Sequence, residues 1–325
     1  MGAVLLGNNA RRAILYYSDT QSMNSSIQQA LAALNSVVLG KPQQVRLALA
    51  CLIARGHLLI EDIPGMGKTT LALAIARVLG LKFQRVQFTS DLLPADILGV
   101  SVYESANGSF RFHPGPIFAQ LVLADEVNRA SPKTQSALLE AMEERQVTAE
   151  GQTRALPEPF FVVATQNPAH QIGTYPLPES QLDRFLMRIS LGYPDAAAER
   201  ALLSERERRD LLGEMQPALT PETLLALQAQ VATIKTQPAL LDYVLALVHH
   251  TREHAGLRQG LSPRAGLSLR RAAQAWALLD GRPGVIPEDV QAVFPAVVNH
   301  RLVAISEREA GAPTAEEILS RVAIP

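Results

Sequence analysis

One stretch of the chain combines residue types that bind phosphate groups. It lies between an apolar, strand-like run and a helix-like run, and its residues are Asp62, Ile63, Pro64, Gly65, Met66, Gly67, Lys68, Thr69 and Thr70. Glycines let backbone N–H groups approach phosphates, the lysine can reach the terminal phosphates, and the Thr69 hydroxyl can bind Mg²⁺. The stretch therefore predicts a P-loop that binds a nucleotide, although Asp62 replaces the first glycine of the usual pattern. Kinases, switches and motors all use such a loop, so the loop alone does not identify the reaction.

Two carboxylates follow a second apolar run, which extends from Gln120 to Ala124. Adjacent strand residues point to opposite sides, so Asp125 and Glu126 can take different tasks. Asp125 suits the coordination shell of Mg²⁺, and Glu126 suits the polarisation of a water for in-line attack on a γ-phosphate. We therefore expect the apparatus of nucleotide hydrolysis beside the P-loop.

Asn167 follows a third strand-like run, from Phe160 to Thr165. Its amide can orient the attacking water or form a hydrogen bond with the γ-phosphate. The alternative is a turn-forming asparagine before Pro168.

The elements that position these residues alternate along the first two thirds of the chain. Five β-rich runs, separated by helical or looped stretches, predict a parallel sheet wrapped by helices, an α/β architecture; they are residues 57–61, 83–88, 120–124, 160–165 and 186–191. The last third has only helical patterns, with helix starts expected at Thr220-Pro221 and Ser262-Pro263. We therefore predict a loose tail over residues 1–23, a nucleotide-binding α/β domain over 24–193 and a small helical domain over 194–325.

The composition excludes several classes of protein. The chain has 325 residues with 30 Lys and Arg against 31 Asp and Glu, so its net charge does not favour nucleic acid or an anionic membrane as the main partner. Cys51 is the only cysteine, which excludes an intrachain disulfide and a cysteine-based metal site and favours a reducing cytoplasm. The apolar runs fall far short of the roughly 18 residues that a membrane span needs.

The order of the motifs resembles that of AAA+ ATPases. The P-loop, Asp125-Glu126 and Asn167 are followed by Gln181-Leu182-Asp183-Arg184-Phe185 and by Ser262-Pro263-Arg264-Ala265. Finer detail resembles the MoxR family, in the stretches at residues 87–99, 115–119 and 173–179. The resemblance covers about residues 24 to 310, and its motifs lie in separate parts of the chain.

The resemblance implies a role for three of these residues. Asn167 matches the sensor 1 position, Arg184 matches the arginine finger presented to a neighbouring subunit, and Arg264 matches the sensor 2 position on the helical lid, from which it would report the γ-phosphate. An arginine finger contributes about 10³ to 10⁵ in rate by neutralising transition-state charge. Arg188 and Arg129 are rival candidates for the residue that acts in trans. A surface salt bridge for Arg184 and a solvated first-turn position for Arg264 are the structural alternatives.

The resemblance also implies an architecture and a function. The fold would be a P-loop AAA+ core, with a parallel sheet flanked by helices, followed by a small all-helical lid, and with insertions at about residues 96–113 and 148–159. The chain would be a cytoplasmic ATPase that binds ATP and Mg²⁺ between the subunits of a ring, expected to be a hexamer. Hydrolysis would remodel partner proteins, including ones with von Willebrand factor A domains, in a chaperone-like role that matures client enzyme complexes or inserts metal cofactors. Two alternatives are the ATPase subunit of a metal chelatase and a non-catalytic, nucleotide-dependent assembly scaffold.

Two further patterns carry less weight. His250 and His254 are spaced to share one helix face beside His249, but no third metal ligand is apparent in the sequence. Basic and acidic residues alternate over positions 205–209, which indicates a solvated helix, and aromatic residues make up 5% of the chain, so a base-stacking surface has little support.

Overall fold

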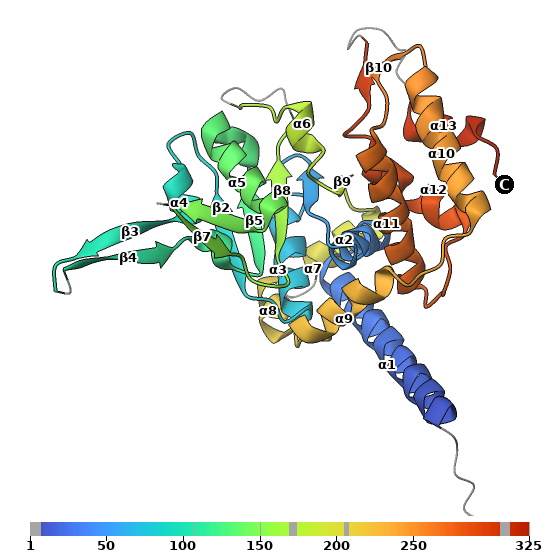
Figure 1. The fold of residues 1–325 in the computed structure, drawn as a ribbon, viewed down its shortest axis with the longest axis horizontal. Helices are drawn as coiled ribbons and strands as arrows, with labels where there is room; N and C mark the ends of the chain where they lie inside the picture. Colours follow the sequence, from blue (N-terminus) through green and yellow to red (C-terminus); the bar gives the residue numbers. More distant parts are fainter. Residues whose placement is uncertain are drawn as a thin grey trace, which may run out of the picture.

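The computed structural model describes residues 8–106, 108–149, 151–168, 174–204, 208–305 and 313–324, with side chains from Met23 onward except at positions 208 and 209. Figure 1 shows an α/β body that carries the central sheet and, beside it, a group of helices formed by the last part of the chain. No helix among the described residues is long and apolar enough to span a membrane.

The central sheet has five parallel strands in the order β2-β5-β8-β1-β9. Their bounds are Leu58–Glu61 for β1, Phe83–Gln87 for β2, Leu121–Asp125 for β5, Phe161–Gln166 for β8 and Met187–Ile189 for β9. All five predicted runs are therefore strands, each within about a residue or two of its expected bounds. The continuous burial of β5 and of most of β8 explains why these two runs are apolar without alternation.

The two faces of the sheet pack against different helices. Leu58 and Ile60 face the cluster that contains α2 (Pro42–Ile53) and α3 (Lys68–Val78), whereas Leu59 faces the cluster that contains α5 (Pro132–Glu144). This alternation follows from the two-residue period of a strand. Both faces are thus covered, as a parallel sheet requires.

Short elements connect the strands at the edges of the sheet. Their bounds are α4 Pro94–Leu98, η1 Pro116–Phe118, η2 Val127–Arg129 and α6 Glu179–Leu182. Two antiparallel hairpins overlap the regions expected as insertions: β3 (Gly99–Glu104) with β4 (Ser109–Pro114), and β6 (Gln146–Ala149) with β7 (Gln152–Ala155). The β3–β4 hairpin projects away from the body (Figure 1).

The last part of the chain is mainly helical. Its elements are α7 Ala196–Ser204, α8 Arg208–Glu214, α9 Pro221–Val231, α10 Pro238–Glu253, β10 Leu257–Gln259, α11 Pro263–Leu279, α12 Pro287–Val298, β11 Val303–Ala304 and α13 Ala315–Arg321. Thr220 and Ser262 cap α9 and α11 as predicted, since each hydroxyl accepts a hydrogen bond from a backbone N–H of the first turn. The helices pack on α2 and α3 through one continuous apolar cluster.

Two expectations need correction. The lid is not wholly helical, because β10 and β11 form a two-stranded antiparallel sheet. Most of the tail expected over residues 1–23 is helical, because α1 extends from Asn8 to Val37. No glycine or proline interrupts the sequence between Asn8 and Leu39, so nothing in it ends the helix earlier.

Candidate functional site

The phosphate-binding loop connects β1 to α3 and begins directly after Glu61. Gly65 and Gly67 have φ angles of +88° and +86°, a left-handed conformation that favours glycine. A Cβ atom built on either residue would meet nothing within 4 Å, so this part of the loop borders open space. The backbone of the loop is therefore accessible to a ligand at the N-terminus of α3, where a helix favours anions.

Lys68 is buried at the first position of α3. Its Nζ donates hydrogen bonds to the backbone oxygen of Asp62 and to Oδ1 of Asn167, the latter at 3.1 Å. Burial lowers the pKa of Lys68, and the negative charges of Asp62, Asp125 and Glu126 oppose this effect. The predicted phosphate lysine and the predicted Asn167 thus meet, although they lie 99 positions apart.

Asp62 joins the phosphate-binding loop to the segment that leaves β9. Its Oδ2 accepts hydrogen bonds from Ser190 Oγ at 3.0 Å, from the Leu191 backbone N–H at 2.8 Å and from the Gly192 backbone N–H at 2.6 Å. Its Oδ1 accepts from the Ile63 backbone N–H at 2.9 Å. A glycine at this position would provide none of these contacts, which gives a structural reason for the departure from the usual P-loop pattern.

Asp125 ends β5 and is almost fully buried. Its Oδ2 pairs with the Arg85 guanidinium at 2.6 Å, and its Oδ1 accepts a hydrogen bond from Thr165 Oγ1 at 2.6 Å. Arg85 lies on β2 and Thr165 on β8, the two strands that flank β5. The carboxylate is therefore held at the carboxyl edge of the sheet, beside the phosphate-binding loop.

Glu126 follows Asp125 in a left-handed conformation, with a φ angle of +56°. Three side chains donate to its carboxylate: Asn167 Nδ2 at 3.1 Å, Gln87 Nε2 at 2.9 Å and Arg129 at 3.0 Å. Non-glycine residues in this backbone region are uncommon and tend to occur at functional sites. The predicted pair of carboxylates thus has the separate environments that different tasks require.

The sequence interpretation missed Gln87, Arg85 and Thr165 as members of this site. In the parallel register, Gln87 lies opposite Asp125, so its side chain reaches the neighbouring Glu126. The only sequence signal is that Gln87 and Thr165 are polar residues at the ends of strand-like runs, where a parallel sheet gathers its functional side chains.

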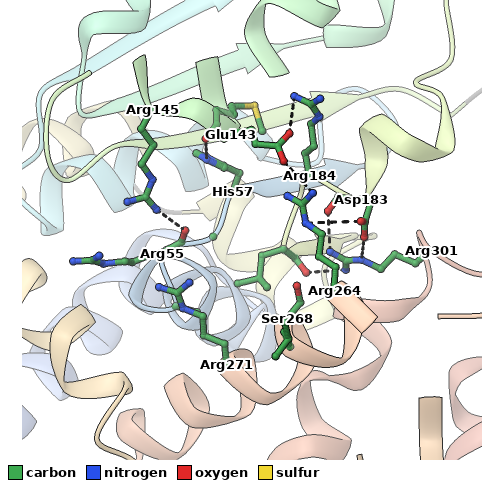
Figure 2. Close-up of a pocket in the computed structure, with 15 residues that line it drawn as sticks. Arg55, His57, Glu143, Arg145, Asp183, Arg184, Arg264, Ser268, Arg271 and Arg301 are labelled. Carbon is green, nitrogen blue, oxygen red and sulfur yellow. Dashed lines mark hydrogen bonds and ion pairs between the residues drawn. The ribbon is translucent and has the colours of Figure 1, made fainter. Parts of the chain in front are cut away.

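Arg184 and Arg264 are brought together at a different place. Arg184 contacts Glu143 at 3.0 Å, and Arg264 contacts the same carboxylate at 3.1 Å. Both line a cavity between the sheet domain and α11 that also includes His57, the residue directly before β1 (Figure 2). The phosphate-binding loop follows the other end of β1, so the cavity and the loop lie at opposite edges of the sheet, about 13 Å apart along a four-residue strand.

The rival arginines have partners nearer the phosphate-binding loop. Arg129 pairs with Glu126, and Arg188 pairs with Glu61 at 2.9 Å. Arg184 is therefore the one of the three candidates that lines the cavity at the far edge. Within this chain, Arg264 also lines that cavity, where it contacts Glu143.

The remaining candidate groups are the Cys51 thiol and the pair of histidines on α10. Cys51 is fully buried, and burial strongly raises the pKa of its thiol. The rings of His250 and His254 pack edge to face, and the described residues contain no group of three His, Cys, Asp or Glu side chains that can hold a metal ion. Gly173 of the family-like stretch at 173–179, the neighbouring Ile172 and residues 205–207 of the charged run lie outside the described residues.

Comparisons with known proteins agree with this fold. Residues 57–187 match the model of the ATPase family associated with various cellular activities (AAA), and residues 249–322 match the AAA lid domain. Chaperone MoxR1 of Mycobacterium tuberculosis is 41% identical over 310 residues, which are 91% of this chain and 81% of that protein. Protein MoxR of Paracoccus denitrificans is 36% identical over 309 residues, which are 88% of this chain and 91% of that protein.

A solved structure shares the whole arrangement. It belongs to a Cytophaga hutchinsonii protein for which an ATPase activity is proposed, with a TM-score of 0.86 and 35% identity over 97% of this chain and 99% of that one. These likenesses run through both the sheet domain and the helical lid. The chain is therefore an ATP hydrolase and belongs to the MoxR family of AAA ATPases.

Proposed function

We propose that this ATPase works as a ring, expected to be a hexamer, in which each nucleotide site is completed by the neighbouring copy. The observation that carries the proposal is the distance between Arg184 and Arg264 on one side and the phosphate-binding loop on the other. Two cations at the far edge of the sheet cannot reach a nucleotide on their own chain without a large rearrangement. They are well located for one that a second copy holds against this edge.

At the loop, the residues divide the work of hydrolysis. The backbone N–H groups of Gly65, Met66 and Gly67 and the ammonium group of Lys68 bind phosphate oxygens. Glu126 accepts a proton from the attacking water, and Asn167 orients that water or the γ-phosphate. The hydrogen bonds that now join Lys68 and Glu126 to Asn167 support this assignment, because the groups already share one small volume.

The loop edge also suits Mg²⁺. The ion prefers oxygen ligands and commonly binds one or two protein side chains together with substrate phosphates. Thr69 and Asp125 are the side chains that would hold it here. Arg85 now pairs with Asp125 but is half exposed, so it is able to move aside as the metal binds. When bound, Mg²⁺ would neutralise charge on the phosphates and make the γ-phosphate a better electrophile.

Arg184 and Arg264 would act in trans. Guanidinium groups stabilise the charge that develops on a transferred phosphoryl group, and an arginine finger contributes about 10³ to 10⁵ in rate. Glu143 holds both side chains near each other in this chain. A phosphate from the neighbouring copy would replace Glu143 as their anionic partner.

Our proposal for how the chain acts on other proteins is supported by the name of a relative. Mycobacterium tuberculosis MoxR1 is named a chaperone, and we propose that this chain likewise remodels client enzyme complexes in the cytoplasm, with metal cofactor insertion as one outcome and von Willebrand factor A domain proteins as partners. The projecting β3–β4 hairpin is suited to protein contact. Its Tyr103 and Phe110 are 55% and 74% exposed and pack edge to face near the tip.

Mixing two inactive variants tests the shared site. Lys68→Ala should lose nucleotide binding but still supply its arginines, whereas Arg184→Ala should bind ATP but supply no finger. Each alone should be nearly inactive, and a mixture should regain ATPase activity because some interfaces then combine a complete loop with a complete finger. The proposal is refuted if Arg184→Ala alone has normal turnover, or if assembled mixtures, verified by their size, regain none.

A different experiment would identify the client proteins. A Glu126→Gln chain retains the side chains that bind ATP but lacks the proposed base, so it should hold nucleotide and client together. Capture of partners with this variant in the presence of ATP, compared with Lys68→Ala, would identify proteins whose binding depends on nucleotide. Equal recovery with both variants would argue against ATP-dependent remodelling.

A further inference from the structure

The cavity between the sheet domain and α11 contains an unusual concentration of positive charge. Its volume is about 260 Å³, and six arginines line it: Arg55, Arg145, Arg184, Arg264, Arg271 and Arg301. The acidic residues of the lining are Glu143 and Asp183. Figure 2 shows the arginines in two groups, with Arg55, Arg145 and Arg271 on one side and the other three near the carboxylates.

On the acidic side the charges are paired. Arg184 and Arg264 share Glu143, while Arg301 binds Asp183 with a 2.6 Å contact. Arg301 is almost fully buried and also donates to backbone oxygens. This side of the cavity is therefore close to electrical balance within the chain.

On the other side, no carboxylate within the described part of the chain forms an ion pair with Arg55, Arg145 or Arg271, which we call the arginine triad. Arg55 donates to the Gln228 side chain at 3.1 Å, and Arg145 donates to the backbone oxygen of Arg55 at 3.5 Å. Among the described residues, Arg271 makes no ion pair or side-chain hydrogen bond. Three positive charges thus lie on this side of the cavity without a carboxylate partner among the described residues.

The charges of the arginine triad disfavour the protonated form of Arg271. The pKa of Arg271 is lowered from its ordinary value, first by partial removal from water and then by repulsion from Arg55 and Arg145. Like charges that line one cavity repel one another, and a bound anion would relieve this repulsion. The arrangement therefore favours a ligand of opposite charge.

The ends of two helices position two members of the arginine triad. Arg145 is the C-cap of α5, and Arg55 directly follows the C-cap of α2. Their φ angles of +52° and +57° are the left-handed conformation that commonly ends a helix. The backbones of these two arginines are therefore fixed where α2 and α5 end.

We propose that the arginine triad is a binding site for a multiply charged phosphate group. Guanidinium groups bind phosphate oxygens through paired, charge-assisted hydrogen bonds, and three arginines that line one cavity suit a group with several oxygens and more than one negative charge. The site is adjacent to Arg184 and Arg264 but does not include them, and it does not depend on their proposed role in trans. The phosphate belongs either to a nucleotide held by a second copy of the chain or to a free phosphate compound.

Binding of inorganic pyrophosphate to the Lys68→Ala chain tests the site. This background weakens phosphate binding at the P-loop and stops hydrolysis, so the outcome is independent of the proposed ATPase mechanism. Titration calorimetry in a phosphate-free buffer should detect one site per chain, and adding Arg271→Gln should weaken binding by about tenfold or more. Arg270→Gln is the matched control, because Arg270 is the neighbouring exposed arginine of α11 and does not line the cavity.

Two results would overturn the proposal: no pyrophosphate binding to the Lys68→Ala chain, or equal binding by the Arg271→Gln and Arg270→Gln forms. Equal unfolding midpoints of the two forms would exclude a general loss of folding, and Arg145→Gln provides a second triad variant.

The two sources of the phosphate give different results in chains with Lys68 intact. If the phosphate belongs to a neighbouring nucleotide, Arg271→Gln should slow ATP turnover at protein concentrations where the chain assembles. If it belongs to a free compound, Arg271→Gln should lose pyrophosphate binding and keep normal turnover.

Discussion

Asp62 provides the most direct test of how the phosphate-binding loop is held. In an Asp62→Ala variant the loop would lose the carboxylate that accepts hydrogen bonds from Ile63, Ser190, Leu191 and Gly192. The last two donors belong to the segment that connects the sheet domain to the lid. The substitution therefore removes the link between the nucleotide site and this connection, not only a charge in the loop.

The expected size of the effect follows from the donors left behind. Asp62 is 8% exposed, and the N–H groups of Leu191 and Gly192 donate to it at 2.8 and 2.6 Å in a largely buried place. A buried donor without a partner costs about 1–3 kcal/mol, so two such donors predict a loss of about 2 to 6 kcal/mol in the free energy of unfolding. Lys68 would also lose a nearby negative charge that supports its protonated form.

Urea unfolding and ATP binding would measure these two consequences. Asp195→Ala is the matched control, because its carboxylate is exposed and caps α7 through a single hydrogen bond to the Ala198 backbone N–H at 2.7 Å. Loss of such a cap costs about 1 kcal/mol. Asp62→Gly restores the glycine of the usual P-loop pattern, and an Asp62→Gly chain as stable as the wild type, with the same ATP affinity, would refute the reasoning.

Three further predictions concern the same structure. Glu126→Gln should retain ATP binding but slow steady-state hydrolysis by about 10² or more, because the amide cannot accept the proton of the attacking water, and unchanged turnover would instead favour the scaffold alternative. Gln87→Leu removes one of the three donors to the Glu126 carboxylate, so we expect basal turnover to rise without a change in ATP affinity; a fall in turnover would indicate that Gln87 helps catalysis. Burial lowers the pKa of His57 from 6.5 to about 4, so its neutral form stabilises the fold above pH 6.5 and this contribution, about 3 kcal/mol, should be lost as the pH falls towards 4. Unfolding of His57→Gln measured from pH 7.5 to 4.5 should show a shallower pH dependence than wild type, and an unchanged slope would contradict this assignment.

The fold was largely predictable because its signals are local. Buried parallel strands require continuous apolar runs, and all five runs identified in the sequence are strands. Helix starts at Thr220 and Ser262 were predictable for the same reason, since a cap and its proline are neighbours in the chain. The short β10–β11 sheet was not, because its strands have three and two residues and pair across more than 40 positions.

The candidate site likewise contains some residues whose role was predictable from the sequence and others whose role was not. Lys68 belongs to the phosphate-binding loop, and Asp125, Glu126 and Asn167 follow strand-like runs, so their residue types and order alone predicted that they serve one nucleotide site. Asp62 was recognised only as a departure from a pattern. Its partners from Ser190 to Gly192 lie about 130 positions away, and a strand order of β2-β5-β8-β1-β9 is what makes β1 and β9 neighbours.

The sequence by itself determined the nucleotide chemistry and the elements that carry it, because residue type, hydrophobic period and motif order are properties of short segments. Only the tertiary structure decided where the arginines lie. Arg264 follows a helix cap, and a cap does not indicate which part of the fold the helix will pack against. The folded chain brings Arg264 beside Arg184 and Glu143. The arginine triad likewise comes from three separate segments, so its charge is apparent only after the chain has folded.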